Sequence, residues 1–147
     1  MKRICLLLLL CTSLASAAER DAAPPQLIAN SQLRVLDVPG PGRKYQLHIG
    51  LPASYATDPK RKYPVVYVTD GYWDFQKLIA IRPVLVTDKV VPEFIVVGLG
   101  YAGEGLNYQS LRLGDLLPMP YAKVPESGHA AAFLRLIEEH VIPLVER

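Results

Sequence analysis

Two short runs of apolar, mostly β-branched residues constrain the fold of this chain more than any other feature. Residues 64–69 read PVVYVT and residues 93–98 read EFIVVG. Strands that are buried on both faces have this composition, as in a parallel sheet covered by helices. Residues 72–80, between the two runs, predict a helix with a broad apolar face, which Pro83 ends or kinks. A buried strand, a helix and a second buried strand predict an α/β sheet with a right-handed crossover.

A third segment has a different pattern and precedes the first buried run. Residues 44–51 (KYQLHIGL) alternate strictly, with Tyr45 and Leu47 on one face and His48 on the other. Strict alternation predicts a half-buried antiparallel strand near the edge of the sheet, with His48 as a solvated residue. Residues 32–38 predict a further edge strand, because the sequence PGPG at 39–42 is a strong turn signal that ends it.

The chain after the second buried run divides into a loop and a helix. Residues 101–126 contain Gly, Pro, Asn and Tyr without a regular period and predict a long irregular loop of the kind that carries function. Ser127 is expected to cap a helix that continues to about Val145, with a bend or restart at Pro143. Because no strand follows this helix in the sequence, the pattern predicts an α/β sheet that is incomplete.

The first 18 residues are predicted to form a secretory signal peptide. Lys2 and Arg3 precede a Leu-rich run that is shorter than the ~20 residues of a membrane-spanning helix. The sequence Ala-Ser-Ala at 15–17 fits the small-x-small cleavage pattern. A lipoprotein signal at Cys11 is the weaker alternative, because Leu10 stands where such signals carry Gly or Ala. Residues 19–31 are then a flexible N-terminal arm, and residues 32–147 are one domain.

Removal of this signal changes the charge and the cysteine content of the chain. The full sequence has 16 Lys+Arg and 14 Asp+Glu, so loss of Lys2 and Arg3 leaves 14 of each sign. A neutral chain has no long-range field to hold nucleic acid or an anionic membrane, and we expect neither as a partner. Cys5 and Cys11 also leave with the signal, which excludes a disulfide, a thiol nucleophile and a thiolate metal site. These features predict an exported protein, periplasmic or secreted, that is stabilised by its core and has no membrane span after cleavage.

Several stretches, in the right order, resemble the esterase-D-like and enterochelin-esterase-like branch of the α/β-hydrolases. They are YQLHIGLP at 45–52, YPVVYVTDG at 63–71, VVGLGY at 96–101, RLGDLLP at 112–118 and SGHA at 127–130. The resemblance extends over nearly all of the mature chain, from Tyr45 to Arg147. The resemblance implies that residues 32–147 are the N-terminal portion of an α/β-hydrolase domain, with antiparallel edge strands leading into a parallel sheet with flanking helices.

The resemblance also implies a chemistry and positions for it. The family hydrolyses esters with a Ser-His-acid triad, so the full-length form is expected to act on a small-molecule ester without a cofactor or metal. One oxyanion donor of the family follows the DG that ends its strand, which implies the backbone N–H of Tyr72, with Gly71 allowing the close turn. The alternative is that Asp70-Gly71 is only a strand-to-helix turn. Arg112 and Asp115 have two candidate roles: they line the substrate mouth, or they form an internal ion pair that holds the long loop.

The chain departs from the family at the nucleophile. The motif G-x-S-x-G does not occur, and it surrounds none of the serines at positions 31, 54, 110 and 127. His129 stands where the family often has Gly, and His140 lies on the polar face of the last predicted helix. No catalytic residue is therefore assigned, and the nucleophilic Ser, the acid and the His are expected beyond the chain end. Two interpretations follow: an exported ester hydrolase truncated before its nucleophile and inactive as this chain, or a small non-catalytic envelope binding protein that keeps half of the fold.

Overall fold

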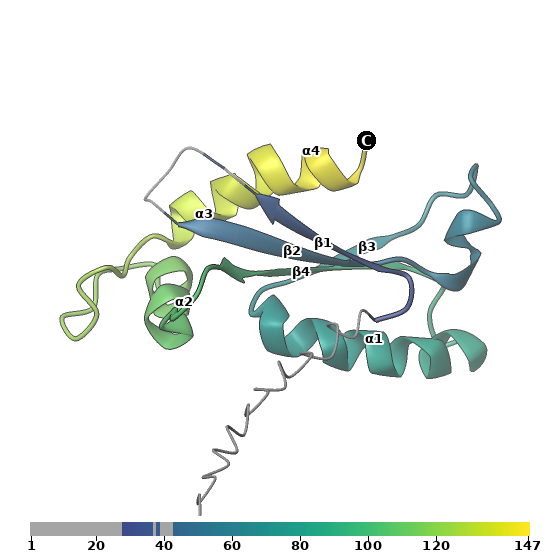
Figure 1. The fold of residues 1–147 in the computed structure, drawn as a ribbon, viewed down its shortest axis with the longest axis horizontal. Coiled ribbons are helices and arrows are strands. Elements are labelled where there is room, and N and C mark those ends of the chain that lie inside the picture. The colour runs from purple at the N-terminus through teal and green to yellow at the C-terminus, as the bar shows by residue number, and fades with distance from the viewer. Residues whose placement is uncertain (1–27, 37, 39–42) are drawn as a thin grey trace, which may run out of the picture.

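A single four-stranded sheet organises the chain. The computed structural model describes residues 28–36, 38 and 43–147, so the predicted signal peptide, most of the predicted arm and the PGPG turn lie outside the described residues. The strands have the spatial order β1-β2-β4-β3 (Figure 1). Their bounds are β1 Ser31–Leu36, β2 Lys44–Gly50, β3 Val65–Val68 and β4 Ile95–Ala102. The pairs β1–β2 and β2–β4 are antiparallel and the pair β3–β4 is parallel, which confirms the predicted change from antiparallel edge strands to a parallel sheet.

Helix α1, Gly71–Thr87, is the crossover between the two parallel strands. The expectation that Pro83 ends or kinks it is wrong for the end of the helix, because α1 continues to Thr87 with Pro83 inside it. The neighbouring Arg82 explains this continuation. Its buried guanidinium donates hydrogen bonds to the carbonyls of Gly50 (3.0 Å), Phe94 (3.1 Å) and Leu51 (2.8 Å), which holds the last part of the helix against the sheet.

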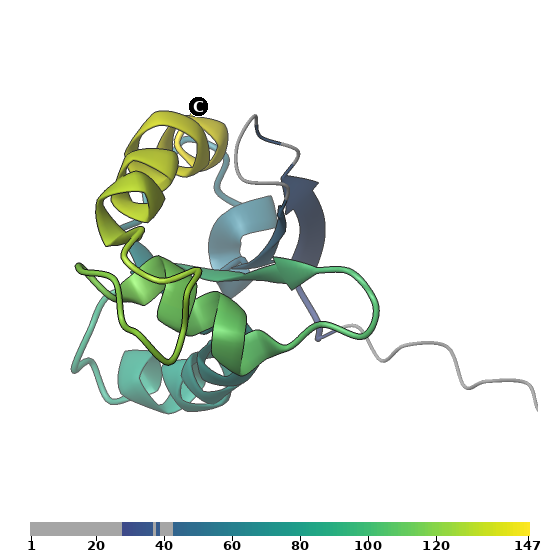
Figure 2. The same ribbon diagram turned by 90° about the vertical axis from the view of Figure 1, so that its left-hand side faces the viewer.

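Helices cover both faces of the sheet, and each face has its own core (Figures 1 and 2). On one face α1 buries Phe75 against Phe94 and Val96. On the other face lie the C-terminal helical segments, which are α3 Ala130–Leu136, a π-helical turn at Ile137–Val141 and α4 Ile142–Val145. They bury Phe133 and Val141 against the apolar face of β2 and against β4. The π-helical turn ends just before Pro143, and α4 begins with Pro143 in its first turn, which agrees with the predicted restart.

The second face of β2 is covered rather than solvated. His48 is only partly exposed, and its ring lies 5.4 Å from the ring of Phe75 on α1. Burial lowers the pKa of His48 below its usual value. His48 is therefore less solvated than predicted, because α1 packs against part of the polar face of β2.

The predicted loop at 101–126 contains a helix that the sequence pattern did not indicate. Helix α2, Tyr108–Leu116, begins where the side chain of Asn107 accepts a hydrogen bond from the Ser110 N–H at 3.1 Å. Ser127 does not cap the last helix, because α3 begins three residues later, at Ala130. Its buried hydroxyl oxygen instead accepts a hydrogen bond from the Tyr121 N–H (2.6 Å) and fixes the loop before α3. A short 3-10 helix at Ala53–Ala56 completes the described elements. No helix among the described residues is long and apolar enough to cross a membrane.

Candidate functional site

The turn between β3 and α1 brings a backbone very close to the sheet. Asp70 adopts a left-handed conformation, with φ 56° and ψ 36°, immediately before Gly71 starts the helix. A Cβ on Gly71 would lie 2.4 Å from the carbonyl carbon of Gly98 and 2.6 Å from the nitrogen of Leu99. Both contacts are to the backbone of β4, which cannot move aside as a side chain does. The glycine is therefore required for α1 to start this near the sheet.

This start leaves the Tyr72 N–H without a partner in the described part of the chain. The carbonyl of Asp70 accepts the N–H groups of Trp73 (2.9 Å) and Asp74 (3.1 Å), but no described carbonyl accepts that of Tyr72. The first N–H groups of a helix are unpaired within the helix and carry its positive end, so they favour a negative charge. Gly100 of β4 lies beside it, since a Cβ there would be at contact distance, 3.8 Å, from the Tyr72 nitrogen. The arrangement therefore has a free donor at the carboxyl ends of β3 and β4.

Arg112, from α2, holds the side chain of Asp70. Its Nε lies 2.9 and 3.1 Å from the two carboxylate oxygens, and one terminal nitrogen lies 2.7 Å from Oδ2. This two-pronged geometry is the strong form of an arginine–carboxylate pair. The hydrogen bonds to Asp70 raise the pKa of Arg112. Arg112 therefore forms an ion pair, which is the second of its two predicted roles, but its partner is Asp70 and not Asp115.

Asp115 is the centre of a second, buried cluster. It is only 2% exposed, and its carboxylate accepts hydrogen bonds from the guanidinium of Arg43 and from the hydroxyls of Tyr45 and Tyr101, each hydroxyl at 2.9 Å. Burial, with the charge of Asp115 as a further cause, raises the pKa values of both tyrosines. Gly114 makes room for this cluster, because a Cβ there would lie 3.0 Å from an Arg43 nitrogen.

Sequence reasoning missed three of the four members of this cluster. Arg43 follows the PGPG turn and precedes β2, where no periodic pattern marks a buried charge. The sequence pattern assigns Tyr45 to a strand and Tyr101 to the start of the long loop, with no partner for either hydroxyl, whereas Tyr101 lies in β4. One available signal was that Tyr45 lies on the apolar face of β2, because a buried tyrosine hydroxyl needs a hydrogen-bond partner.

Aromatic rings gather at the start of α1. The ring of Tyr72 lies 5.2 Å from that of Tyr108 and 5.5 Å from that of Trp73. The ring of Tyr108 in turn lies 6.2 Å from that of Tyr101. These separations are those of favourable aromatic pairs. Tyr72 and Trp73 are about half exposed, so this group of rings lies at the surface.

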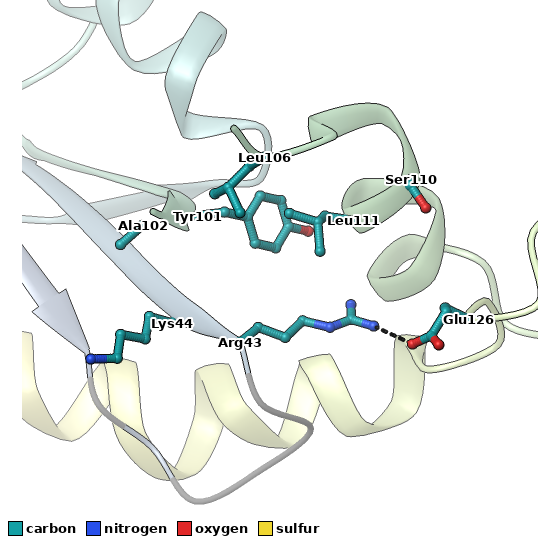
Figure 3. Close-up of a pocket in the computed structure, with 8 residues that line it drawn as sticks. All are labelled: Arg43, Lys44, Tyr101, Ala102, Leu106, Ser110, Leu111 and Glu126. Carbon is teal, nitrogen blue, oxygen red and sulfur yellow. Dashed lines mark ion pairs between the residues drawn. The ribbon is translucent and has the colours of Figure 1, made fainter. Parts of the chain in front are cut away.

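A pocket of about 490 Å³ lies beside the same end of β4 (Figure 3). Tyr101 and Leu111 form its wall, and Arg43 reaches across it toward Glu126, at 3.8 Å. Arg112 and Asp115 are not among the residues that line it, and Asp115 borders a separate hollow of about 320 Å³ under α3. A role for Arg112 and Asp115 in lining the substrate mouth stays a prediction.

The described serines and histidines form no nucleophile and base pair. The Ser54 hydroxyl contacts Glu93 and Tyr63, at the opposite end of β3 from the turn, and Ser127 binds the Tyr121 N–H. His48 bonds Gln46 at 3.0 Å. Among residues 28–36, 38 and 43–147, no group of three His, Cys, Asp or Glu side chains could hold a metal ion.

A mixed sheet with the order β1-β2-β4-β3, a crossover helix starting on a close glycine turn and helices on both faces is the arrangement of part of an α/β-hydrolase fold. The sequence agrees, because the family described as "Putative esterase" matches residues 39–147. The chain belongs to this esterase family, as its motifs indicated. A comparison with curated proteins finds no match.

Several solved structures share the fold. The BES protein from Bacillus cereus is 30% identical, with a TM-score of 0.65 over 82% of this chain and 47% of its own. An IroE-like serine hydrolase from Shewanella oneidensis is 24% identical, with a TM-score of 0.67 over 79% of this chain and 38% of its own. The siderophore hydrolase EstB from Aspergillus nidulans is 24% identical, with a TM-score of 0.63 over 82% of this chain and 45% of its own. The chain spans less than half the length of each of these structures.

Proposed function

We propose that this chain is the part of an exported, serine-type carboxylic ester hydrolase that supplies an oxyanion donor, the backbone N–H of Tyr72. The observation that carries the proposal is the unpaired state of this N–H among the described residues, at the positive end of α1. Family membership supports the ester-hydrolase class. The signal-like segment at residues 1–18 motivates the export, and N-terminal sequencing of exported protein should begin at Ala18 or Glu19. A mature chain that still begins at Met1 would contradict export.

The chemistry requires a donor of this kind. When a serine attacks an ester carbonyl, the carbonyl oxygen becomes an oxyanion, and fixed N–H groups stabilise it more than they stabilise the neutral substrate. The Tyr72 N–H is fixed because Gly71 is pressed against β4 and because Trp73 and Asp74 already bond the Asp70 carbonyl. Gly71 therefore contributes by allowing the close turn, and the Tyr72 side chain is not needed for the donation.

The nucleophile must come from residues other than these 147, because no G-x-S-x-G occurs among them. We therefore expect the purified 147-residue chain to hydrolyse short p-nitrophenyl esters no faster than a denatured control. Turnover that disappears in Ser127→Ala would refute this expectation. For a longer protein that contains the motif, siderophore esters are the first substrates to test, because siderophore hydrolases are among the similar structures.

Two substitutions of Tyr72, made in a longer protein that contains both this segment and G-x-S-x-G, test the donor. Tyr72→Pro removes the N–H, and the first turn of a helix tolerates proline. Loss of one oxyanion donor is expected to lower kcat by roughly 10²–10³. Tyr72→Ala keeps the N–H and removes a side chain that is 53% exposed, so its effect should be mild. Both variants are first checked by circular dichroism, and a folded Tyr72→Pro enzyme with full kcat would show that the donor lies elsewhere.

A further inference from the structure

We propose that Arg112 is a positioning residue that keeps the Asp70 carboxylate away from the Tyr72 N–H, so that the donor stays open. The catalytic meaning of this role rests on the proposed function. The geometric role itself does not, and it can be measured on the 147-residue chain.

The first step is an exception to helix capping at α1. Asp is among the residues preferred at the N-cap because its side-chain oxygen accepts the N–H of the second or third helical residue. Asp70 stands at the N-cap of α1, and Tyr72 and Trp73 occupy those two positions. Asp70 nevertheless makes no side-chain cap hydrogen bond. Its two carboxylate oxygens are both held by Arg112 instead.

The second step concerns the backbone of Asp70. An N-cap residue that uses its side chain as a cap has an extended conformation, whereas Asp70 is left-handed, with φ 56°. Asp tolerates that conformation better than most non-glycine residues, but it still has a cost that a surrounding contact can offset. The ion pair with Arg112 is a contact of this kind, since it joins the turn to α2, forty-two residues away in sequence. Without Arg112, Asp70 is free to return to the extended conformation and cap the helix.

The third step is what such a cap would do to the donor. A carboxylate that accepts the Tyr72 N–H would occupy the place of the oxyanion. It would also set a negative charge next to the place where negative charge develops. Arg112 prevents both, because it withholds the carboxylate and balances its charge. The arginine thus acts on the reaction through Asp70 and does not touch the substrate.

Amide NMR of Tyr72 tests this role directly. The chain is labelled with ¹⁵N-tyrosine, and the Tyr72 signal is assigned by its absence in Tyr72→Phe. In Arg112→Gln we expect the Tyr72 amide proton to shift downfield and to exchange with water roughly tenfold more slowly, as for an N–H that acquires a charged acceptor. The matched control is Arg61→Gln, which breaks a similar pair with Glu93 (2.8 Å) at the other end of β3 and should leave the Tyr72 amide unchanged.

Asp70→Gly separates this role from a merely structural one. Glycine adopts the left-handed conformation freely and has no carboxylate, so the turn no longer depends on Arg112. In the Asp70→Gly background, adding Arg112→Gln should leave the shift and exchange of the Tyr72 amide unchanged. If Arg112→Gln alone does not fold but the double variant does, the unbalanced carboxylate is again identified as the cause, which supports the proposal.

Three results would overturn the proposal. The first is an unchanged Tyr72 amide in Arg112→Gln, and the second is a double variant as perturbed as Arg112→Gln alone. The third is that Arg112→Gln and the double variant both fail to fold while Asp70→Gly folds. Arg112 would then act independently of Asp70. None of these results depends on ester hydrolysis. Failure of the proposed function would appear separately, as full activity of Tyr72→Pro in the longer protein.

Discussion

Replacement of Asp115 by Asn should destabilise the chain far more than any exposed Asp→Asn change. Asp115 accepts one guanidinium and two phenol hydrogen bonds while 2% exposed, so every one of its partners is oriented toward its charge. Asn has nearly the same shape but offers one acceptor oxygen and an NH₂ group. If the amide oxygen faces Arg43, the two hydroxyls must accept from the NH₂ group and lose their own acceptor, and in the other orientation the NH₂ group faces the guanidinium.

The magnitude follows from the burial of the pair. The side chains of Arg43 and Asp115 are 8% and 2% exposed, so water screens their interaction little. Without the carboxylate, the nearest remaining anion of Arg43 is Glu126, at 3.8 Å and with a side chain that is 78% exposed. Breaking a buried pair by removing one charge costs about 3–5 kcal/mol, and we expect Asp115→Asn to fall in this range. This is a large part of the 5–15 kcal/mol that is typical of a folded domain.

Urea unfolding measures this loss, followed by far-ultraviolet circular dichroism and by the fluorescence of Trp73, which is the chain's single tryptophan. The matched control is Asp74→Asn. It breaks an exposed pair with Lys77, where the side chains are 45% and 73% exposed, and should cost under about 1 kcal/mol. A free energy of unfolding for Asp115→Asn within about 1 kcal/mol of the parent would refute the reasoning, because the cluster would then contribute no more than a surface pair.

Two further predictions concern the turn and the covered face of β2. Gly71→Ala places a Cβ 2.4 Å from the backbone of β4 and should lower the free energy of unfolding by roughly 1–3 kcal/mol. Gly100→Ala, whose Cβ meets nothing nearer than 3.8 Å, should be tolerated, and equal losses in urea would contradict the steric argument. Burial lowers the pKa of His48, so as the pH falls the unfolded chain binds a proton before the folded chain does. The free energy of unfolding should therefore keep its full value above pH 6.5 and decline as the pH falls from there toward the folded-state pKa. His48→Gln should weaken this decline in melts recorded across the range, and an unchanged pH profile would show that His48 is not its source.

The sheet was predictable because its signals are local. Strict alternation in residues 44–51 and continuous apolar runs at 65–68 and 95–97 report burial on one face or on both, and the pairing of β2, β3 and β4 agrees. The same local reasoning failed for His48. Alternation shows which residues share a face but not whether a helix later in the chain covers that face, and α1 does so here.

Helix α2 was not predictable in this way because its stability comes from long-range contacts. Its sequence, YQSLRLGDL, is short and contains Gly114, which disfavours a helix. What fixes it are the Asn107 cap, the pair between Arg112 and Asp70 and the cluster around Asp115, whose partner Arg43 is seventy-two residues away. The turn at Asp70-Gly71 was found because a strand, a DG pair and a helix follow each other directly. The partners of Arg112 and Asp115 were not predictable, because nothing in the spacing of these residues along the sequence identifies them.

These contacts give α2 two separate attachments with different consequences. Asp115 joins it to the sheet through a buried cluster, and Arg112 joins it to the turn through a pair whose arginine and aspartate side chains are 32% and 16% exposed. Arg112 contributes by holding Asp70 in place through two-pronged hydrogen bonds. The attachment through Arg112 depends on the attachment through Asp115, but not the reverse. We expect loss of the Asp115 cluster to release the helix that carries Arg112 and so to affect the turn as well, and loss of Arg112 to leave the buried cluster intact. A change at Arg112 should therefore alter the state of the Tyr72 N–H without removing the buried cluster. The sequence RLGD places both charges within four residues of one nine-residue helix.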